Sequence, residues 1–156
     1  MKVLHLDTNH PLLIEQLSEL GFENHVDFTS SKKEIENKIH NYEGLIIRSR
    51  IPIDEQLLSK ATQLKFIGRV GAGLENIDLR YAKEKNIFIA SAPEGNRNAV
   101  GEHTLAMLLN LFNKLNKGHE EVKNGKWKRE DNRGTELDGK TAVSYTHLTL
   151  PTTPYV

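Results

Sequence analysis

The stretch that decides the fold is residues 64–90, LKFIGRVGAGLENIDLRYAKEKNIFIA. Its apolar runs Leu64–Ile67 and Ile87–Ala90 have the length of buried strands, and Ile77–Lys85 between them has a helical pattern. Two short apolar strands joined by a helix are typical of a βαβ unit, in which the strands are parallel. The stretch therefore predicts a parallel sheet that is buried on both faces.

The same alternation of strands and helices occupies the chain before this stretch. Ser31 and Glu34 stand at capping-box distance, so we expect Ser30 or Ser31 to cap a helix that ends at Ile39. Residues 1–97 thus predict an α/β domain with a flavodoxin-like, doubly wound sheet. The further strands that we expect are Lys2–Leu6, Phe22–Phe28 and Gly44–Ile47, and the further helices are Pro11–Leu20 and Asp54–Ser59.

A long helix that opens at Asn98 or Ala99 begins a second region, residues 98–142. Its apolar residues occupy much more than one face, so the helix needs cover from another domain or another subunit. After a polar, basic segment, Arg133–Ala142 predicts a turn that leads into a strand. The apolar positions of the helix are Val100, Leu105, Leu108, Leu109, Phe112 and Leu115.

The composition excludes several classes of protein. The chain has 21 basic and 21 acidic residues, so no overall field attracts nucleic acid or an anionic membrane. It has no cysteine, which excludes disulfides and thiolate metal sites, and its scattered histidines predict no metal site either. Asp7 interrupts the apolar start MKVLHLD, so we expect no signal peptide and a soluble, cytoplasmic protein.

Residues 143–156, VSYTHLTLPTTPYV, differ from the rest of the chain because they contain no Lys, Arg, Asp or Glu. The segment VSYTHLTLPT resembles the translated end of a transposase-based sequencing adapter, beginning within the codon of Ala142. We therefore expect a non-native tail on a native chain that was cut short. The alternative is an ordinary tail rich in Thr and Pro.

Three motifs follow the predicted strands. Arg48 and Ser49 come directly after the strand Gly44–Ile47, where a guanidinium and a hydroxyl suit a carboxylate or phosphate, although solvated charges at the start of a loop explain them equally well. The second motif, GRVGAGLENID at 68–78, has the order GxxGxG and not the dinucleotide fingerprint GxGxxG. Its small residues suit an anion-binding nest, and the alternative is a tight turn with positive φ.

The third motif, SAPEGNRNAVGEHTLAMLL at 91–109, places Asn96 at the same predicted sheet edge. Glu102 and His103 are adjacent on a helix and diverge by about 100°, so they do not form an acid–base pair. A helix-packing role is the better interpretation of His103.

In this order, the three motifs resemble the D-isomer-specific 2-hydroxyacid dehydrogenase family, and among its members most of all the phosphoglycerate dehydrogenases and their relatives. The resemblance covers residues 1 to about 142. It implies a flavodoxin-like substrate domain, then a crossover helix, and then the truncated start of a Rossmann domain whose GxGxxG turn would follow Thr141.

The resemblance also implies roles for individual residues. The backbone of Ala72 and Gly73 would hold the substrate carboxylate, with Ala72 also close to the cofactor. Arg48 and Ser49 would line the same pocket and meet a distal phosphate, and Asn96 would lie at the interdomain cleft. Ala72 stands where the family often has Val or Thr, so a side-chain hydroxyl contact is lost.

The function that the resemblance implies is that of an NAD-dependent oxidoreductase acting on the CH–OH group of a small 2-hydroxy acid, with or without a phosphate. The catalytic Arg, Glu and His of the family would lie beyond residue 142, so we expect this chain itself to be inactive. The complete protein would be a homodimer formed through the helix region 98–117. The alternatives are a stand-alone flavodoxin-like binding or interaction module without catalysis, and a signalling receiver, for which Asp7 is a single acid where a pair is needed.

Overall fold

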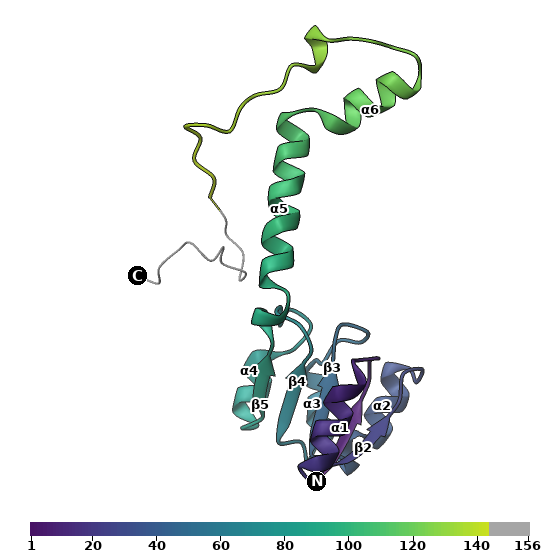
Figure 1. The fold of residues 1–156 in the computed structure, drawn as a ribbon. Helices are drawn as coiled ribbons and strands as arrows, with labels where there is room; N and C mark the ends of the chain where they lie inside the picture. Colours follow the sequence, from purple (N-terminus) through teal and green to yellow (C-terminus); the bar gives the residue numbers. More distant parts are fainter. Residues whose placement is uncertain (144–156) are drawn as a thin grey trace. The chain divides into compact units, whose positions relative to one another are not determined.

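The computed structural model describes residues 1–143 and divides the chain into two units, Met1–Gly95 and a second that begins at Asn96. The first unit contains a five-stranded, all-parallel sheet in the order β2-β1-β3-β4-β5 (Figure 1). This is the strand order of flavodoxin-like folds, so the predicted α/β fold is confirmed. The elements of this unit are β1 Lys2–His5, α1 Pro11–Glu19, β2 Glu23–Val26, α2 Lys32–Lys38, β3 Gly44–Ile47, α3 Glu55–Lys60, β4 Phe66–Arg69, α4 Leu79–Glu84, β5 Phe88–Ser91 and the single turns η1 Ile39–Asn41 and η2 Pro93–Gly95.

The core of the first unit lies between the sheet and helices α2, α3 and α4. Neighbouring helices of this layer contact one another, and right-handed crossovers place α1 on the opposite face of the sheet. All four residues of β3 are buried because this strand lies at the centre of the sheet. The largest fully buried side chains of the core include Leu4, Leu45, Leu57 and Ile67.

The fourth strand begins two residues later than the apolar run predicts. Leu64 is buried in the core but precedes β4, whose pairing with β3 starts at Phe66 opposite Gly44. A strand is defined by its hydrogen-bonded neighbour and not by hydrophobicity, so β3 determines where β4 begins. Similarly, α4 starts after Asp78 because the Asp78 side chain accepts a hydrogen bond from the N–H of Tyr81 at 2.9 Å.

Polar contacts hold the loop between β2 and α2. Ser31 and Glu34 form the predicted capping box at the start of α2. Arg50 donates hydrogen bonds to the carbonyls of Leu6 at 2.8 Å, Ser30 at 2.5 Å and Asp27 at 3.0 Å. Because its guanidinium is used in this way, Arg50 is a structural residue that ties the loop to β1.

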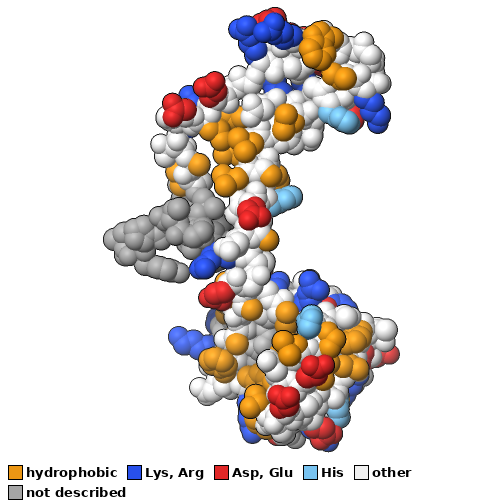
Figure 2. All heavy atoms as spheres, in the orientation of Figure 1, with side chains coloured by type: hydrophobic (Ala, Val, Ile, Leu, Met, Phe, Trp, Pro, Cys, Tyr) orange, Lys and Arg blue, Asp and Glu red, His pale blue; other side chains and the backbone are white. Residues whose placement is uncertain are grey.

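The second unit contains α5 Arg97–Phe112, α6 Leu115–Lys123 and the turn η3 Glu130–Asn132, and no residue of α5 or α6 is buried. The predicted long helix is thus confirmed, but it ends at Phe112, after which Lys114 adopts a left-handed backbone with φ 52°. Figure 2 shows hydrophobic side chains on the visible surface of this unit. No helix in residues 1–143 is long and apolar enough to cross a bilayer.

The strand predicted within Arg133–Ala142 is absent from the described part of the chain, which has no strand after Ser91 up to residue 143. An isolated strand leaves its backbone N–H and C=O groups without partners, and residues 96–143 contain no sheet to which it could pair. The prediction of a non-native tail at 143–156 falls almost wholly on residues 144–156, which lie outside the described residues.

The contact between Lys38 and Asp27 makes stability depend on pH. Burial tends to raise the pKa of Asp27, but hydrogen bonds from Lys38, Ser30 and Thr29 outweigh burial and hold this pKa well below its usual range. A carboxyl whose pKa is lower in the folded state stabilises the fold above the unfolded pKa of about 3.9 and loses this contribution as the pH falls further.

We therefore expect the urea concentration at the midpoint of unfolding to decrease when the pH is lowered below about 4. Asp27→Asn should lower the free energy of unfolding at pH 7 by about 1.5–3 kcal/mol and reduce the acid-dependent fall. Urea titrations at several pH values measure both, with Glu19→Gln as an exposed control on α1. An equal acid-dependent fall in Asp27→Asn and the parent chain would contradict the prediction.

Candidate functional site

The carboxyl ends of β3 and β4 bring the first two motifs together. Ile47 lies opposite Arg69 in the sheet, and the N–H of Val70 donates to the carbonyl of Ile47 at 2.8 Å. Arg48 follows Ile47, and Val70 follows Arg69. The two segments therefore lie side by side where they extend from the same edge of the sheet. The structure thus places the Arg48–Ser49 segment and the glycine segment at one edge, as the strand pattern predicts, while their roles in binding stay predictions.

The backbone of Arg48 is held from two sides. Its N–H donates to Oδ2 of Asp7 at 2.6 Å, and its carbonyl accepts from Nδ2 of Asn76 at 3.2 Å. The side chains of Arg48 and Ser49 are exposed. The segment is therefore fixed through its backbone while the guanidinium and hydroxyl remain accessible to a ligand.

Five consecutive backbone N–H groups of the glycine segment, those of residues 72–76, have no acceptor within residues 1–143. The first two belong to Ala72 and Gly73, which are half-buried and directly follow the turn at Gly71. The turn before them depends on Gly71, whose φ of +146° is a conformation that L side chains rarely adopt. Unpaired N–H groups in a turn of small residues form a concave site that suits an anion.

Arg69 is a residue that the sequence analysis did not single out. Its Nη1 donates to the carbonyl of Val70 at 2.9 Å, and a Cβ on Gly71 would lie 1.5 Å from the same nitrogen. Its Nε is buried and has no partner among the described residues. The guanidinium therefore packs under the glycine turn and adds positive charge to this edge. A charged residue at the end of an otherwise apolar strand is the signal that could have identified it.

Asn96, the remaining predicted site residue, precedes α5 and begins the second unit. Its backbone angles are φ −127° and ψ 1°, and its side chain makes no capping hydrogen bond. The predicted position of Asn96 at an interdomain cleft therefore stays a prediction. His103 is exposed on α5, and no group of three or more His, Cys, Asp or Glu among residues 1–143 has a geometry that could hold a metal ion.

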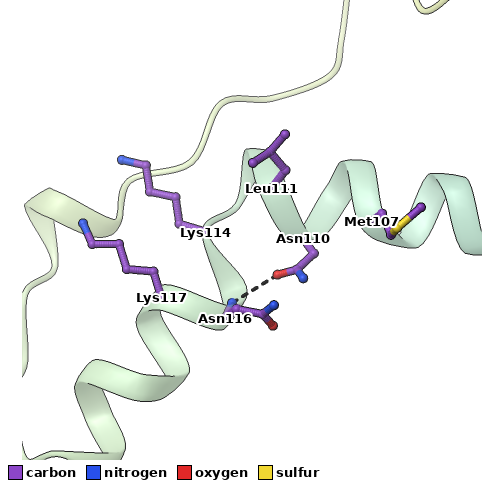
Figure 3. Close-up of a pocket in the computed structure, with 6 residues that line it drawn as sticks. All are labelled: Met107, Asn110, Leu111, Lys114, Asn116 and Lys117. Atoms are coloured by element: carbon purple, nitrogen blue, oxygen red, sulfur yellow. Dashed lines mark hydrogen bonds between the residues drawn. The ribbon is translucent and has the colours of Figure 1, made fainter.

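The second unit contains a cavity of about 380 Å³ lined by Met107, Asn110, Leu111, Lys114, Asn116 and Lys117. Figure 3 shows both lysine side chains extending away from Met107. Nζ of Lys114 donates to the carbonyl of Asp131 at 2.9 Å, and the N–H of Asn116 donates to Oδ1 of Asn110 at 3.1 Å. Nζ of Lys114 and Oδ1 of Asn110 are thus already paired, and we assign no site there.

The profile of the family described as "D-isomer specific 2-hydroxyacid dehydrogenase, catalytic domain" matches residues 3–152. The chain belongs to this family. The match includes part of the segment 143–156, so the prediction that this segment is non-native stays a prediction.

Curated relatives of the chain are D-3-phosphoglycerate dehydrogenases. The protein from Archaeoglobus fulgidus is 35% identical over 142 residues, which are 91% of this chain and 27% of the relative. The human protein is 34% identical over 140 residues, which are 90% of this chain and 26% of the relative. This chain thus spans about a quarter of the length of these relatives.

Solved structures agree with the family. A protein from Pyrococcus horikoshii OT3 has a TM-score of 0.80 and 26% identity, over 89% of this chain and 43% of that one. D-Lactate dehydrogenase from Aquifex aeolicus, solved with NAD and lactic acid, has a TM-score of 0.74 and 26% identity, over 88% of this chain and 41% of that one. This chain therefore shares its fold with both proteins.

Proposed function

We propose that the unit Met1–Gly95 supplies part of the substrate site of an NAD-dependent oxidoreductase that acts on the CH–OH group of a 2-hydroxy acid, as a phosphoglycerate dehydrogenase does. The observation that carries this proposal is that the N–H groups of Ala72 and Gly73 have no acceptor among residues 1–143 and lie on the same sheet edge as the exposed Arg48 and Ser49. Two N–H donors suit a carboxylate, and a guanidinium suits a phosphate.

The role of these residues in the reaction is to bind and orient the substrate. The N–H groups of Ala72 and Gly73 would fix the carboxylate, while Arg48 and Ser49 hold the distal end of the molecule. Asp7 and Asn76 keep Arg48 in position through its backbone. NAD, when bound, exchanges a hydride with C2 of the substrate.

The residues present fit only a small part of the NAD site. The 156 residues contain no GxGxxG turn, so they offer no cradle for the pyrophosphate. Ala72 has no polar side chain and would contribute its methyl and backbone beside the nicotinamide. We therefore expect the purified 156-residue chain to show no turnover of 2-hydroxy acids.

We further infer that the complete protein is a cytoplasmic homodimer. The apolar residues of α5, none of which is buried, support association through the helix region 98–117. A cytoplasmic location agrees with the use of NAD, which is an intracellular cofactor, and with the balanced charge of the chain.

Equilibrium dialysis with labelled 3-phosphoglycerate and D-glycerate tests the substrate assignment on the chain as it stands. We expect saturable binding of 3-phosphoglycerate that Arg48→Gln weakens about tenfold, which corresponds to about 1.4 kcal/mol. Lys83→Gln, at the last turn of α4, removes the same charge away from this edge and should leave binding unchanged. Equal losses in both variants would show that binding depends only on net charge and would contradict the proposal.

We expect removal of the Glu75 charge to strengthen 3-phosphoglycerate binding, in contrast to removal of the Arg48 charge. A Cβ on Gly73 would lie 2.2 Å from a carboxylate oxygen of Glu75, so this negative charge stands beside the N–H groups. Two charges about 5 Å apart in water interact by about 0.8 kcal/mol, so Glu75→Gln should tighten 3-phosphoglycerate binding about fourfold. The same dialysis measures this, with Glu84→Gln on α4 as the control; weaker binding in Glu75→Gln would contradict the prediction.

A further inference from the structure

A second cleft in the first unit lies at the carboxyl ends of β1 and β2, beside the first turns of α1. Its volume is about 340 Å³, and its lining residues include Pro11, Ile14, Val26 and Phe28. Val26 and Phe28 are 56% and 39% exposed, so apolar surface is open to solvent here. A cleft of this size is large enough for a small molecule.

The most deeply buried residue of the cleft is His5, which is 1% exposed. Its Nε2 lies 2.8 Å from Oδ1 of Asn24, whose amide nitrogen donates to Oγ of Ser18 at 3.0 Å. Because this contact orients the Asn24 amide, Oδ1 is the acceptor and Nε2 of His5 carries the hydrogen. Burial lowers the pKa of His5, so the ring is neutral and Nδ1 is an acceptor.

Two of the residues that line the cleft carry a buried acceptor that has no partner among the described residues. One is Nδ1 of His5 and the other is Oδ1 of Asn9, whose amide nitrogen donates to the carbonyl of Asp7 at 2.9 Å. A buried acceptor that has no donor destabilises the fold, because it has lost its hydrogen bond to water and gained none in return. A ligand with several N–H donors would remove this destabilisation at both atoms.

The charge of the cleft selects the kind of donor. Asp7 and Glu15 contribute carboxylates, whereas no Lys or Arg is among its lining residues. The residues 1–143 contain no cluster of His, Cys, Asp or Glu that could hold a metal ion, so a metal is not the expected occupant. An organic ammonium ion has the positive charge, the N–H donors and the apolar body that match this lining.

We propose that this cleft binds a small molecule that carries a primary ammonium group on an apolar body. The site is separate from the substrate site, although Asp7 belongs to both regions because its Oδ2 accepts the N–H of Arg48. The ammonium group would donate to Nδ1 of His5 and Oδ1 of Asn9, and the apolar body would cover Val26 and Phe28.

Equilibrium dialysis of the 156-residue chain tests the proposal with three probes that share a branched five-carbon skeleton: 3-methylbutylammonium, 3-methylbutan-1-ol and 3-methylbutanoate. We expect the ammonium probe to bind saturably with a Kd of about 1 mM. The alcohol should bind at least tenfold more weakly, and the carboxylate should not bind. Equal binding of the alcohol and the ammonium, or no saturable binding of the ammonium, would overturn the proposal.

Three variants locate the binding. Asn9→Ala removes one unpartnered acceptor, and Glu15→Gln removes one carboxylate. Each variant should bind the ammonium probe several-fold more weakly than the parent chain. Glu19→Gln removes the same charge from an exposed position on α1 that does not line the cleft, and it should change nothing. Circular dichroism confirms that each variant is folded. If both Asn9→Ala and Glu15→Gln bind the probe as the parent does, the site assignment is wrong.

Discussion

A chain that ends at Asn96 should remain monomeric at concentrations at which the 156-residue chain self-associates. No residue of α5 is buried, and Leu105, Met107, Leu109 and Leu111 are all at least 44% exposed. Each large apolar side chain left in water forfeits about 1.5–3 kcal/mol of burial, and a contiguous apolar patch favours association. The first unit has its own buried core, so it should stay folded when α5 is deleted.

Light scattering after size exclusion measures the molar mass of both chains, and a hydrophobic dye reports exposed apolar surface. The 156-residue variant with Leu105→Gln, Leu109→Gln and Leu111→Gln should behave like the shorter chain. Glu102→Gln, which changes a charge on the same helix without changing its apolar surface, serves as the control. A monomeric 156-residue chain that melts cooperatively and binds no dye would contradict the prediction.

Ile67→Ala should destabilise the first unit by about 2–5 kcal/mol, because removal of a fully buried side chain loses burial and leaves a cavity. Ile67 lies in β4 between β3 and β5 and is 0% exposed. Against a total stability of about 5–15 kcal/mol, this loss is large enough to lower the urea midpoint strongly.

The neighbouring strand provides a matched control for this change. Phe88 in β5 pairs with Phe66, but it is 69% exposed, so Phe88→Ala should cost much less than Ile67→Ala although it deletes a larger side chain. Urea unfolding of the two variants at neutral pH compares them directly. If Phe88→Ala were the more destabilising change, the face of the sheet that carries Phe88 would be part of the core.

Local signals predicted most of the fold. The apolar runs and the capping box of Ser31 and Glu34 act between residues near in sequence, so the pattern alone locates these elements. The prediction of a strand within Arg133–Ala142 was wrong because strand formation depends on residues far away in the sequence. A strand requires a neighbour, and no local pattern shows whether that neighbour is present.

For the candidate site too, the sequence predicted some features and only the structure showed the others. Arg48, Ser49, Ala72 and Gly73 follow predicted strands, so the topology of a parallel sheet places them at one edge without any knowledge of side-chain contacts. Arg50, two residues after Arg48, offers the same chemistry in the sequence. Only the structure shows that its guanidinium donates hydrogen bonds to the carbonyls of Leu6, Asp27 and Ser30.

By itself, then, the sequence determined the strands of the first unit, the order of the motifs and the family that they resemble, because these depend on local patterns and on the parallel direction of the strands. The tertiary structure decided which polar groups are already paired. Asp7 holds Arg48 from 41 residues away, whereas Nδ1 of His5 and the N–H groups of Ala72 and Gly73 have no partner in the described part of the chain. Hydrogen bonds between distant residues form only where the packed elements bring donor and acceptor within about 3 Å, so the sequence alone does not show which groups remain for a ligand.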